Sequence, residues 1–271
     1  MLVSVDQALG SIGGGHLEWQ AIAQARQALR EHALHIGDTD ASASLASWTQ
    51  HYALGPTLGQ CCGGVVDVAF DALNDDALRA WPETQPRFKL DLHGAGHVGQ
   101  AIVQMLEMLQ APQGIASQVR WIDQRMDHTE AVQLGDRALV GLPSPEALAA
   151  LPPHIQFIST DDAPHEAAEA PWGSLHLVLT HRHDLDLAIV DALLKRDDVI
   201  AGHAWVGLIG SKTKRAAFEH RLLARGHAPE VIARMACPIG VPGIKGKEPA
   251  VIAVSVVAQL LQMRPNSNHT L

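Results

Sequence analysis

The sequence predicts an α/β protein in which a Rossmann-like domain with a parallel sheet follows a smaller α+β domain. A strand-like run, a glycine-rich turn and a helix pattern succeed one another in residues 88–110. Apolar strand patterns then alternate with helix patterns, whereas shorter alternating runs come before them. A polar segment bounded by prolines separates the two regions. We therefore expect an N-terminal domain at residues 1–81 and a C-terminal domain at residues 87–271.

The composition indicates a globular protein that handles a small molecule or a protein partner. The chain has 271 residues, of which 47% are hydrophobic, and this is enough to fill a sizeable core. A net charge of -9 argues against nucleic-acid binding, which needs clustered Lys and Arg. No apolar run reaches the roughly 20 residues of a membrane span, and we expect no stable membrane insertion. The 3 cysteines do not make a disulfide framework, so we expect a cytoplasmic protein with reduced thiols.

The glycine-rich turn between Gly94 and Gly99 is flanked by a strand pattern and a helix pattern. Apolar residues alternate before it and recur at helical spacing after it, at Phe88, Leu90, Leu92, Val98, Ile102, Met105, Leu106 and Leu109. In a GxGxxG turn the first glycine allows the tight bend, the second lets a phosphate approach, and the third lets the helix pack closely. The N–H groups at the helix start, near His97, would bind the anion. The alternative is a structural turn that binds no ligand.

A second predicted strand of the C-terminal domain ends at Asp123. In dinucleotide-binding domains an acidic residue at this place holds a ribose hydroxyl, although Asp123 follows the glycines at more than the usual distance of about 20 residues. Together with the GxGxxG turn, Asp123 permits an NAD(P)-dependent oxidoreductase. The alternative is that the Asp123 carboxylate closes a turn at the strand end.

A second glycine run, Gly13, Gly14 and Gly15, stands at the start of another helix pattern. The apolar face of this helix begins at Leu17, so the glycines and His16 lie at its N-terminus. This arrangement favours a second anion site. The alternative is a close-packed turn with His16 and Glu18 exposed to solvent in the first turn of the helix.

Two adjacent cysteines, Cys61 and Cys62, are expected on a loop rich in glycine between two strands. A disulfide between neighbouring cysteines would close a small strained ring, so free thiols are favoured. Nearby backbone N–H groups can lower a thiol pKa, which suits sulfur handling or the binding of a soft metal. The alternative is that both side chains serve as small buried hydrophobes.

Three further apolar strand regions are predicted at residues 155–160, 175–180 and 199–209. The second is followed by two histidines and two aspartates in residues 181–186, which are either metal ligands or, for Asp184 or Asp186, a helix cap. The third leads to Ser211, Lys212 and two more cations at a helix start. This group predicts an anion site, and the alternative is a solvated basic turn.

The whole sequence resembles the xanthine dehydrogenase accessory proteins, the XdhC and CoxI family. The resemblance rests on six stretches in order along both domains, namely Ile12 to Ile22, Leu54 to Gly64, His93 to Ala101, Thr180 to Asp186, Val206 to Arg215 and Cys237 to Leu261. Family members usually carry a Gly-Ser-x-Pro segment before the position of Met1, so we expect either a mis-assigned start or a shortened chain that lacks an N-terminal strand and part of a cofactor site.

The resemblance implies an accessory protein and not an enzyme. It implies binding of the molybdenum cofactor (molybdopterin), help with its sulfuration by a cysteine desulfurase, and delivery to xanthine dehydrogenase or a related molybdenum hydroxylase. A homodimer is also implied. The cofactor-binding residues we predict are Gly13, Gly14, Gly15, His16, Gln60, Cys61, Cys62, Gly63, Gly94, Gly96, His97, Gly99, Asp123, His183, Ser211 and Lys212, with Cys61 and Cys62 as metal ligands.

Two other classes of function remain open from the residues alone. One is the NAD(P)-dependent oxidoreductase, in which the Rossmann site holds NAD(P) or another nucleotide. The other is a protein-binding scaffold whose Rossmann-like domain binds no ligand. A cofactor chaperone would bind the pterin without turnover, whereas a dehydrogenase would bind NAD(P) and transfer hydride.

Overall fold

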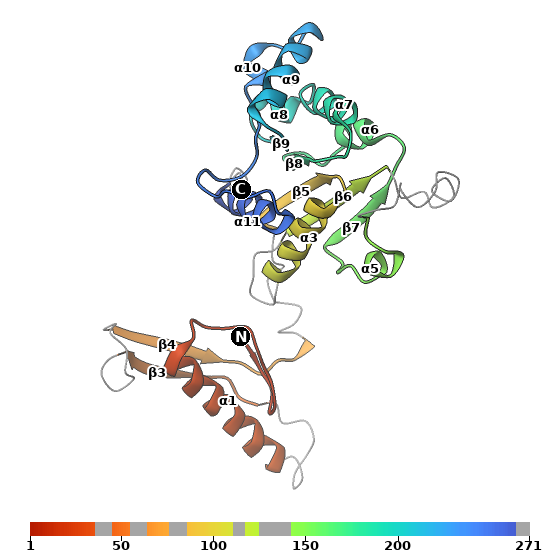
Figure 1. Cartoon of the computed structure of the whole chain (residues 1–271). Coiled ribbons are helices and arrows are strands. Elements are labelled where there is room, and N and C mark those ends of the chain that lie inside the picture. The colour runs from red at the N-terminus through yellow and green to blue at the C-terminus, as the bar shows by residue number, and fades with distance from the viewer. Residues whose placement is uncertain (36–44, 55–63, 76–85, 111–116, 125–141, 264–271) are drawn as a thin grey trace. The chain divides into compact units, whose positions relative to one another are not determined.

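The computed structural model describes residues 1–35, 45–54, 64–75, 86–110, 117–124 and 142–263. The chain divides into two compact units, the first built from Met1–Thr84 and the second from Gln85–Gln110 and Ile115–Leu271. Figure 1 shows the first unit in red and orange and the second from yellow to blue. The second unit has the predicted Rossmann-like fold, and the smaller α+β unit precedes it, so the predicted fold class is confirmed.

The first unit combines one long helix with two small antiparallel sheets. Its elements are β1 (Leu2–Val3), β2 (Ala8–Leu9), α1 (Gly15–His35), β3 (Trp48–Leu54) and β4 (Gly64–Phe70), with β1 paired to β2 and β3 paired to β4. Helix α1 buries Leu17, Ala21 and Ala25, which recur every four residues on one face. The Tyr52 hydroxyl of β3 donates a hydrogen bond to Gln24 of α1 at 2.5 Å, which ties the strand pair to the helix.

The second unit is a six-stranded parallel sheet with helices between the strands. The strands are β5 (Phe88–His93), β6 (Ser117–Asp123), β7 (Ile155–Ser159), β8 (Leu175–Val178), β9 (Trp205–Leu208) and β10 (Met235–Ala236). The helices are α3 (His97–Leu109), α5 (Pro145–Ala149), α6 (Ala163–Ala168), α7 (His183–Leu193), α8 (Asp197–Ala201), α9 (Lys212–Ala224), α10 (Pro229–Ile232) and α11 (Pro249–Gln262).

The strand order of this sheet creates a switch point beside β5. The order is β10-β9-β8-β5-β6-β7, so the chain builds outward from β5 through β6 and β7 and then crosses back to β8. The loops after β5 and β8 therefore leave the sheet in opposite directions. In open parallel sheets, ligands bind in the crevice at the carboxyl ends of such a strand pair.

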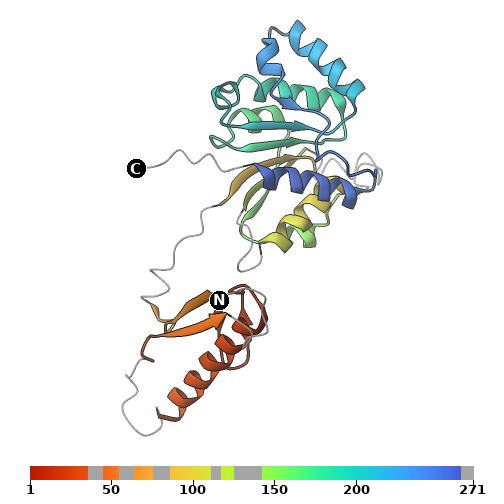
Figure 2. The same cartoon turned by 90° about the vertical axis from the view of Figure 1, so that its left-hand side faces the viewer.

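Helices cover both faces of the sheet (Figure 2). On one face Leu90 and Leu92 of β5 pack in a core with α3 and α11. A second core, which includes Val178 of β8, lies against α6, α7 and α9. Because successive side chains of a strand point to opposite faces, Asp91 and His93 lie on the face away from Leu90 and Leu92.

Residues 199–209 were expected to form one strand region, and this prediction is wrong for its first part. Asp197–Ala201 forms α8, and the strand β9 begins only at Trp205. Gly202 ends the helix in the left-handed conformation, with φ of 83°, which glycine adopts without steric cost. The apolar pattern alone does not distinguish a buried helical turn from a strand.

Helix α11 is the most apolar of the long helices and lies against α3. In the part of the chain that the structure describes, no helix is both long enough and apolar enough to cross a membrane.

Candidate functional site

The turn after β5 uses two of its glycines for purely steric reasons. Gly94 has φ of 128°, and a Cβ there would lie 2.5 Å from the carbonyl oxygen of Leu179. A Cβ at Gly99 would lie 2.2 Å from the carbonyl oxygen of Gly94. Any side chain at either position would displace backbone, because heavy atoms do not approach so closely. Gly94 thus allows the tight bend, and Gly99 allows α3 to pack on the turn.

Gly96 differs from both, since the described residues leave it room for a side chain. No described heavy atom lies within 4 Å of the place that its Cβ would take. Its φ of -72° is one that every residue adopts. Gly96 is also the N-cap of α3, and no side chain caps the helix there. The backbone N–H groups at the start of α3 consequently border space that the described residues leave open, and the start of a helix favours an anion.

Asp123 at the end of β6 is part of the turn itself. Its side chain is buried, and its Oδ2 accepts a hydrogen bond from the backbone N–H of Ala95 at 2.6 Å. The indole Nε1 of Trp121 donates to the carbonyl oxygen of Gly94 at 3.1 Å. Both bonds join β6 to the turn after β5. This bond agrees with the alternative that the Asp123 carboxylate closes a turn. A ribose hydroxyl bound to Asp123 would compete with the Ala95 N–H for the same carboxylate.

A buried ion pair lies behind the loop after β8. Asp186 accepts hydrogen bonds from the Thr180 hydroxyl at 2.7 Å and from its backbone N–H at 3.0 Å. Lys214 of α9 contacts the other oxygen of Asp186 at 2.6 Å and also donates to the carbonyl oxygen of Ile209. Asp186 is fully buried. This network joins the carboxyl ends of β8 and β9 to α7 and α9, and it fixes the loops that border the switch point.

The prediction that Asp184 or Asp186 caps α7 is wrong. The N-cap is Arg182, and no side chain makes a capping bond there. Asp184 lies in the first turn of α7 and forms an ion pair with Arg182. The Asp186 carboxylate instead forms an ion pair with Lys214 of α9. This contact is between distant parts of the chain, so the local sequence does not predict it.

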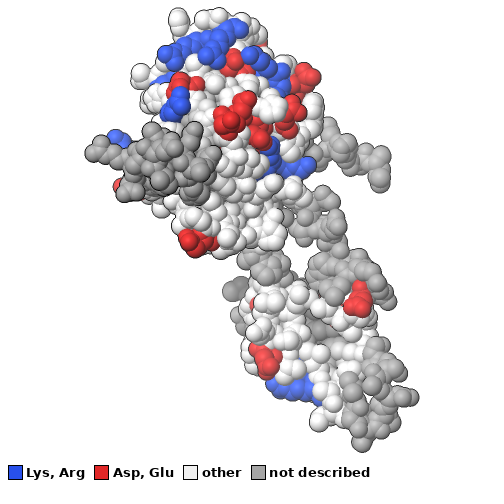
Figure 3. All heavy atoms as spheres, turned by 90° about the vertical axis from the view of Figure 1, so that its right-hand side faces the viewer, with Lys and Arg blue, Asp and Glu red and all other residues white. Residues whose placement is uncertain are grey.

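The polar and basic residues at the start of α9 differ in their contacts. The Ser211 side chain is the N-cap and accepts a hydrogen bond from the Lys214 backbone N–H. Lys212 is exposed. Arg215 pairs with Glu219 and also donates to the carbonyl oxygen of Cys237. Figure 3 shows basic side chains gathered at the end of the second unit that α9 and α10 form in Figure 1, with acidic ones beside them.

In the first unit, the glycine run is held by a carboxylate from its own helix. Glu18 accepts hydrogen bonds from the Ser11 hydroxyl and from the backbone N–H groups of Ile12 and Gly14. The Ser11 bond, followed by the two backbone bonds, lowers the pKa of the Glu18 carboxyl. Glu18 therefore occupies the N–H groups of Ile12 and Gly14, and Gly13, Gly14 and Gly15 all have positive φ.

The structure brings together the predicted residues of the second unit at one edge of the sheet. Gly94, Gly96, His97 and Gly99 follow β5, His183 begins α7 after β8, and Ser211 and Lys212 begin α9 after β9. These three strands are neighbours and parallel. Gly13, Gly14, Gly15 and His16 belong to the first unit. Gln60, Cys61, Cys62 and Gly63 lie outside the described residues, so the thiol site stays a prediction.

Our sequence reasoning missed a buried cluster of Asp91, His93 and His176. Its potential ligand atoms all lie within 4.8 Å of one another. The signal was present in the sequence, since the strands LDLH and LHLV place polar residues where a central strand with two covered faces should be apolar.

The chain matches known proteins along most of its length. Residues 90–260 match the family model of the XdhC Rossmann domain. Residues 1–37 match the model of the XdhC and CoxI family. The described elements β5 to α11 thus fall within the first match, apart from the edges of β5 and α11.

The chain is also similar to the uncharacterized protein YqeB of Escherichia coli (strain K12). The two are 28% identical over 270 residues, which make up 98% of this chain and 40% of YqeB. The chain therefore spans about two fifths of the length of this relative.

Proposed function

Because the chain belongs to the XdhC and CoxI family, we propose that it is an accessory protein that binds the molybdenum cofactor and delivers it to a molybdenum hydroxylase of the xanthine dehydrogenase type. The family models match the Rossmann unit and the start of the first unit, and membership of this family supports the accessory role. Binding of the cofactor, a phosphorylated pterin dithiolene, is supported by the chemistry of the turn after β5.

The observation that carries this proposal is the open space at Gly96. Gly94 and Gly99 are needed by the fold, because a Cβ at either would overlap backbone atoms. At Gly96 a Cβ would overlap none of the described residues, so the fold does not explain the glycine there. A Cβ would instead fill the space in front of the start of α3, which no side chain caps. A ligand that approaches the backbone closely is a sufficient reason for a glycine at this position, and an anion suits the N–H groups around it.

In the proposed complex, the backbone N–H groups at the start of α3 would hold the pterin phosphate. His97 is exposed at this helix start and would orient the ligand beside them. When bound, the cofactor supplies the molybdenum centre that the partner hydroxylase needs for its reaction. The Cys61 and Cys62 thiols would hold the molybdenum or protect its exchangeable sulfur, since soft sulfur donors suit such a centre.

The proposal includes two further partners and a place of action. A cysteine desulfurase would supply the sulfur, and a second copy of the chain would complete a homodimer in the cytoplasm. These parts rest on the family resemblance alone. An NAD(P)-dependent oxidoreductase is the alternative that the GxGxxG turn permits, and it differs in both ligand and turnover.

One binding experiment separates the two functions. The full chain is mixed with isolated molybdenum cofactor, NAD(H) or NADP(H), and binding is measured for the wild type, Gly96→Ala and Gln104→Ala. Gln104 is exposed on α3 and serves as the control on the same helix. We expect cofactor binding that Gly96→Ala weakens and Gln104→Ala preserves, with no hydride transfer. Binding of NAD(P) with turnover, and none of the pterin, would refute the proposal.

A further inference from the structure

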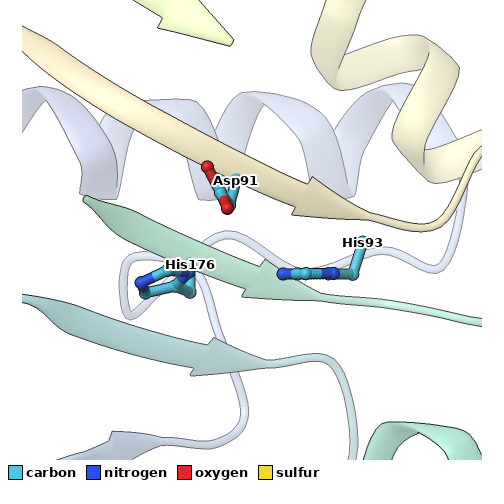
Figure 4. Close-up of side chains that lie close together, drawn as sticks. All are labelled: Asp91, His93 and His176. Carbon is cyan, nitrogen blue, oxygen red and sulfur yellow. The ribbon is translucent and has the colours of Figure 1, made fainter. Parts of the chain in front are cut away.

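The strongest unassigned feature of the molecule is the cluster of Asp91, His93 and His176 in the core of the second unit. Asp91 and His93 are two residues apart on β5 and so lie on the same face of the sheet. His176 stands directly opposite Asp91 in the register of β5 and β8. Figure 4 shows the ring of His93 extending toward His176, with the Asp91 carboxylate beside them.

Both imidazole rings are buried without a hydrogen-bond partner. His93 and His176 have 0% exposed surface, and Asp91 has 1%. All four ring nitrogens of the two histidines lack a partner among the described residues. A buried polar group left without a partner costs about 1–3 kcal/mol. Two such rings side by side in the core are therefore candidates for binding a ligand, since no described side chain satisfies their nitrogens.

Burial disfavours the charged form of both rings. Burial, followed by the nearby positive charge of Arg120, lowers the pKa of His93 to about 3. Burial is also the main reason that the pKa of His176 is well below its ordinary value, and His93 and Arg196 lower it further.

The carboxylate of the cluster is oriented by a neighbouring strand. Arg120 of β6 donates to Oδ2 of Asp91 at 2.7 Å, and its other terminal nitrogen contacts Glu166 of α6. Because Glu166 also pairs with the guanidinium, the charge of Arg120 is shared between two carboxylates. A metal-binding carboxylate is commonly held in this way by a hydrogen bond from outside the ligand set.

We propose that Asp91, His93 and His176 bind a divalent metal ion, zinc or one of its first-row neighbours. The ion would lie in the core between the sheet and the helices α6 and α7. Two imidazoles and one carboxylate form a ligand set that zinc and its first-row neighbours accept, whereas calcium and magnesium prefer oxygen. Ligand bonds of about 2.0–2.2 Å place ligand atoms at most ~4.4 Å apart. The candidate ligand atoms lie within 4.8 Å of one another, so a small rotation of the side chains brings them to that separation.

This metal would join the two strands that flank the switch point. His93 is followed directly by Gly94, and β5 is paired with β8 at His176. An ion held between them would stabilise the strand pair immediately behind the turn after β5. The site is independent of the proposed function, since it lies within the core and shares no residue with the predicted cofactor site.

The test begins with the metal content of the full chain. The protein is treated with a chelator, reconstituted with Zn²⁺ and examined by X-ray absorption at the zinc edge. We expect stoichiometric zinc with only nitrogen and oxygen neighbours at about 2.0–2.2 Å. Sulfur neighbours at about 2.3 Å would assign that zinc to cysteines, and loss of all zinc from the Cys61→Ser, Cys62→Ser double variant would then overturn the proposal. Absence of tightly bound Zn²⁺, Co²⁺ or Fe²⁺ from the wild type would overturn it as well and would favour buried water beside the rings.

Variants then locate the ion. His93→Ala and His176→Ala should each lower Zn²⁺ affinity by more than the roughly 10–100-fold that loss of an outer partner costs. His154→Gln is the matched control, because His154 also has a buried nitrogen without a partner but lies outside the cluster. The Cys61→Ser, Cys62→Ser double variant should keep the site, which separates it from the proposed thiol site. Retention of zinc by both alanine variants would contradict the proposal, and if these variants do not fold, the wild-type spectrum decides.

Discussion

The Oδ2 of Asp123 lies 2.6 Å from the backbone nitrogen of Ala95 and accepts its hydrogen bond. Ala95 is fully buried in the turn after β5, so its N–H has no access to water. The carboxylate of one strand end thus fixes the backbone of the neighbouring turn. This bond supports the turn together with the glycines around it.

Removing this carboxylate should destabilise the second unit. Asp123→Ala leaves the Ala95 N–H buried without an acceptor, which costs about 1–3 kcal/mol in the free energy of unfolding. Asp123→Asn keeps an oxygen acceptor and should lose less. Urea unfolding of both variants measures the difference. Equal stability of the wild type and Asp123→Ala would mean that the bond does not support the turn.

Replacing Gly99 should lower the stability of the protein, whereas replacing Gly96 should not. Gly99→Ala places a Cβ against the Gly94 carbonyl oxygen and should lower the free energy of unfolding by about 1–3 kcal/mol. Gly96→Ala should leave stability close to that of the wild type, since its φ and the open space accept a methyl group. Thermal unfolding of the two variants provides the comparison. A Gly96→Ala variant as unstable as Gly99→Ala would show that Gly96 is also required by the fold.

The Lys214–Asp186 pair offers a test of the network behind the β8 loop. Lys214→Met leaves the buried Asp186 carboxylate without its counter-charge, and breaking a buried pair in this way costs about 3–5 kcal/mol. Lys212→Met changes an exposed lysine two residues away and is the control. Chemical denaturation should show a large loss for Lys214→Met alone. Similar values for the two variants would mean that the pair contributes little.

The glycine run of the first unit should respond to the protonation of Glu18. Since the Ser11, Ile12 and Gly14 bonds lower the pKa of Glu18, the bonds persist at neutral pH and weaken as the pH falls through that lowered value. NMR titration should show the amide signals of Ile12 and Gly14 moving with a midpoint below the usual pKa of glutamate. In Glu18→Gln the same signals should not titrate. A midpoint at the usual value would show that the bonds are absent in solution.

The thiols distinguish the cofactor chaperone from an oxidoreductase, which has no need of them. Cys61→Ser and Cys62→Ser keep nearly the same volume but replace a good metal ligand with a poor one. We expect both variants to fold and to lose molybdenum cofactor retention and activation of the partner hydroxylase, with a slightly larger effect at Cys62. Circular dichroism is the folding control. Wild-type retention and activation in the double serine variant would show that the pair only packs.

The sequence by itself determined the fold class of this protein and the place of its glycine turns. Alternating apolar residues, glycines at fixed offsets and helical periodicity are local signals, and each is contained in a few neighbouring residues. They located β5, the turn and α3 correctly. The same local signals failed where a helical turn and a strand share an apolar pattern, as in α8 and β9.

Tertiary structure decided what the polar residues do. Asp186 was expected at a helix end, but it pairs with Lys214, which is 28 positions away in the chain. Asp123 bonds Ala95 across 28 positions, and His176 meets Asp91 and His93 only because β8 returns to pair with β5. Pairing of this kind depends on strand order and register, which arise from the packing of the whole sheet, so the residues near each side chain do not identify its partner. The residue type determines which chemistry a side chain can perform, but the tertiary structure determines which partner it contacts.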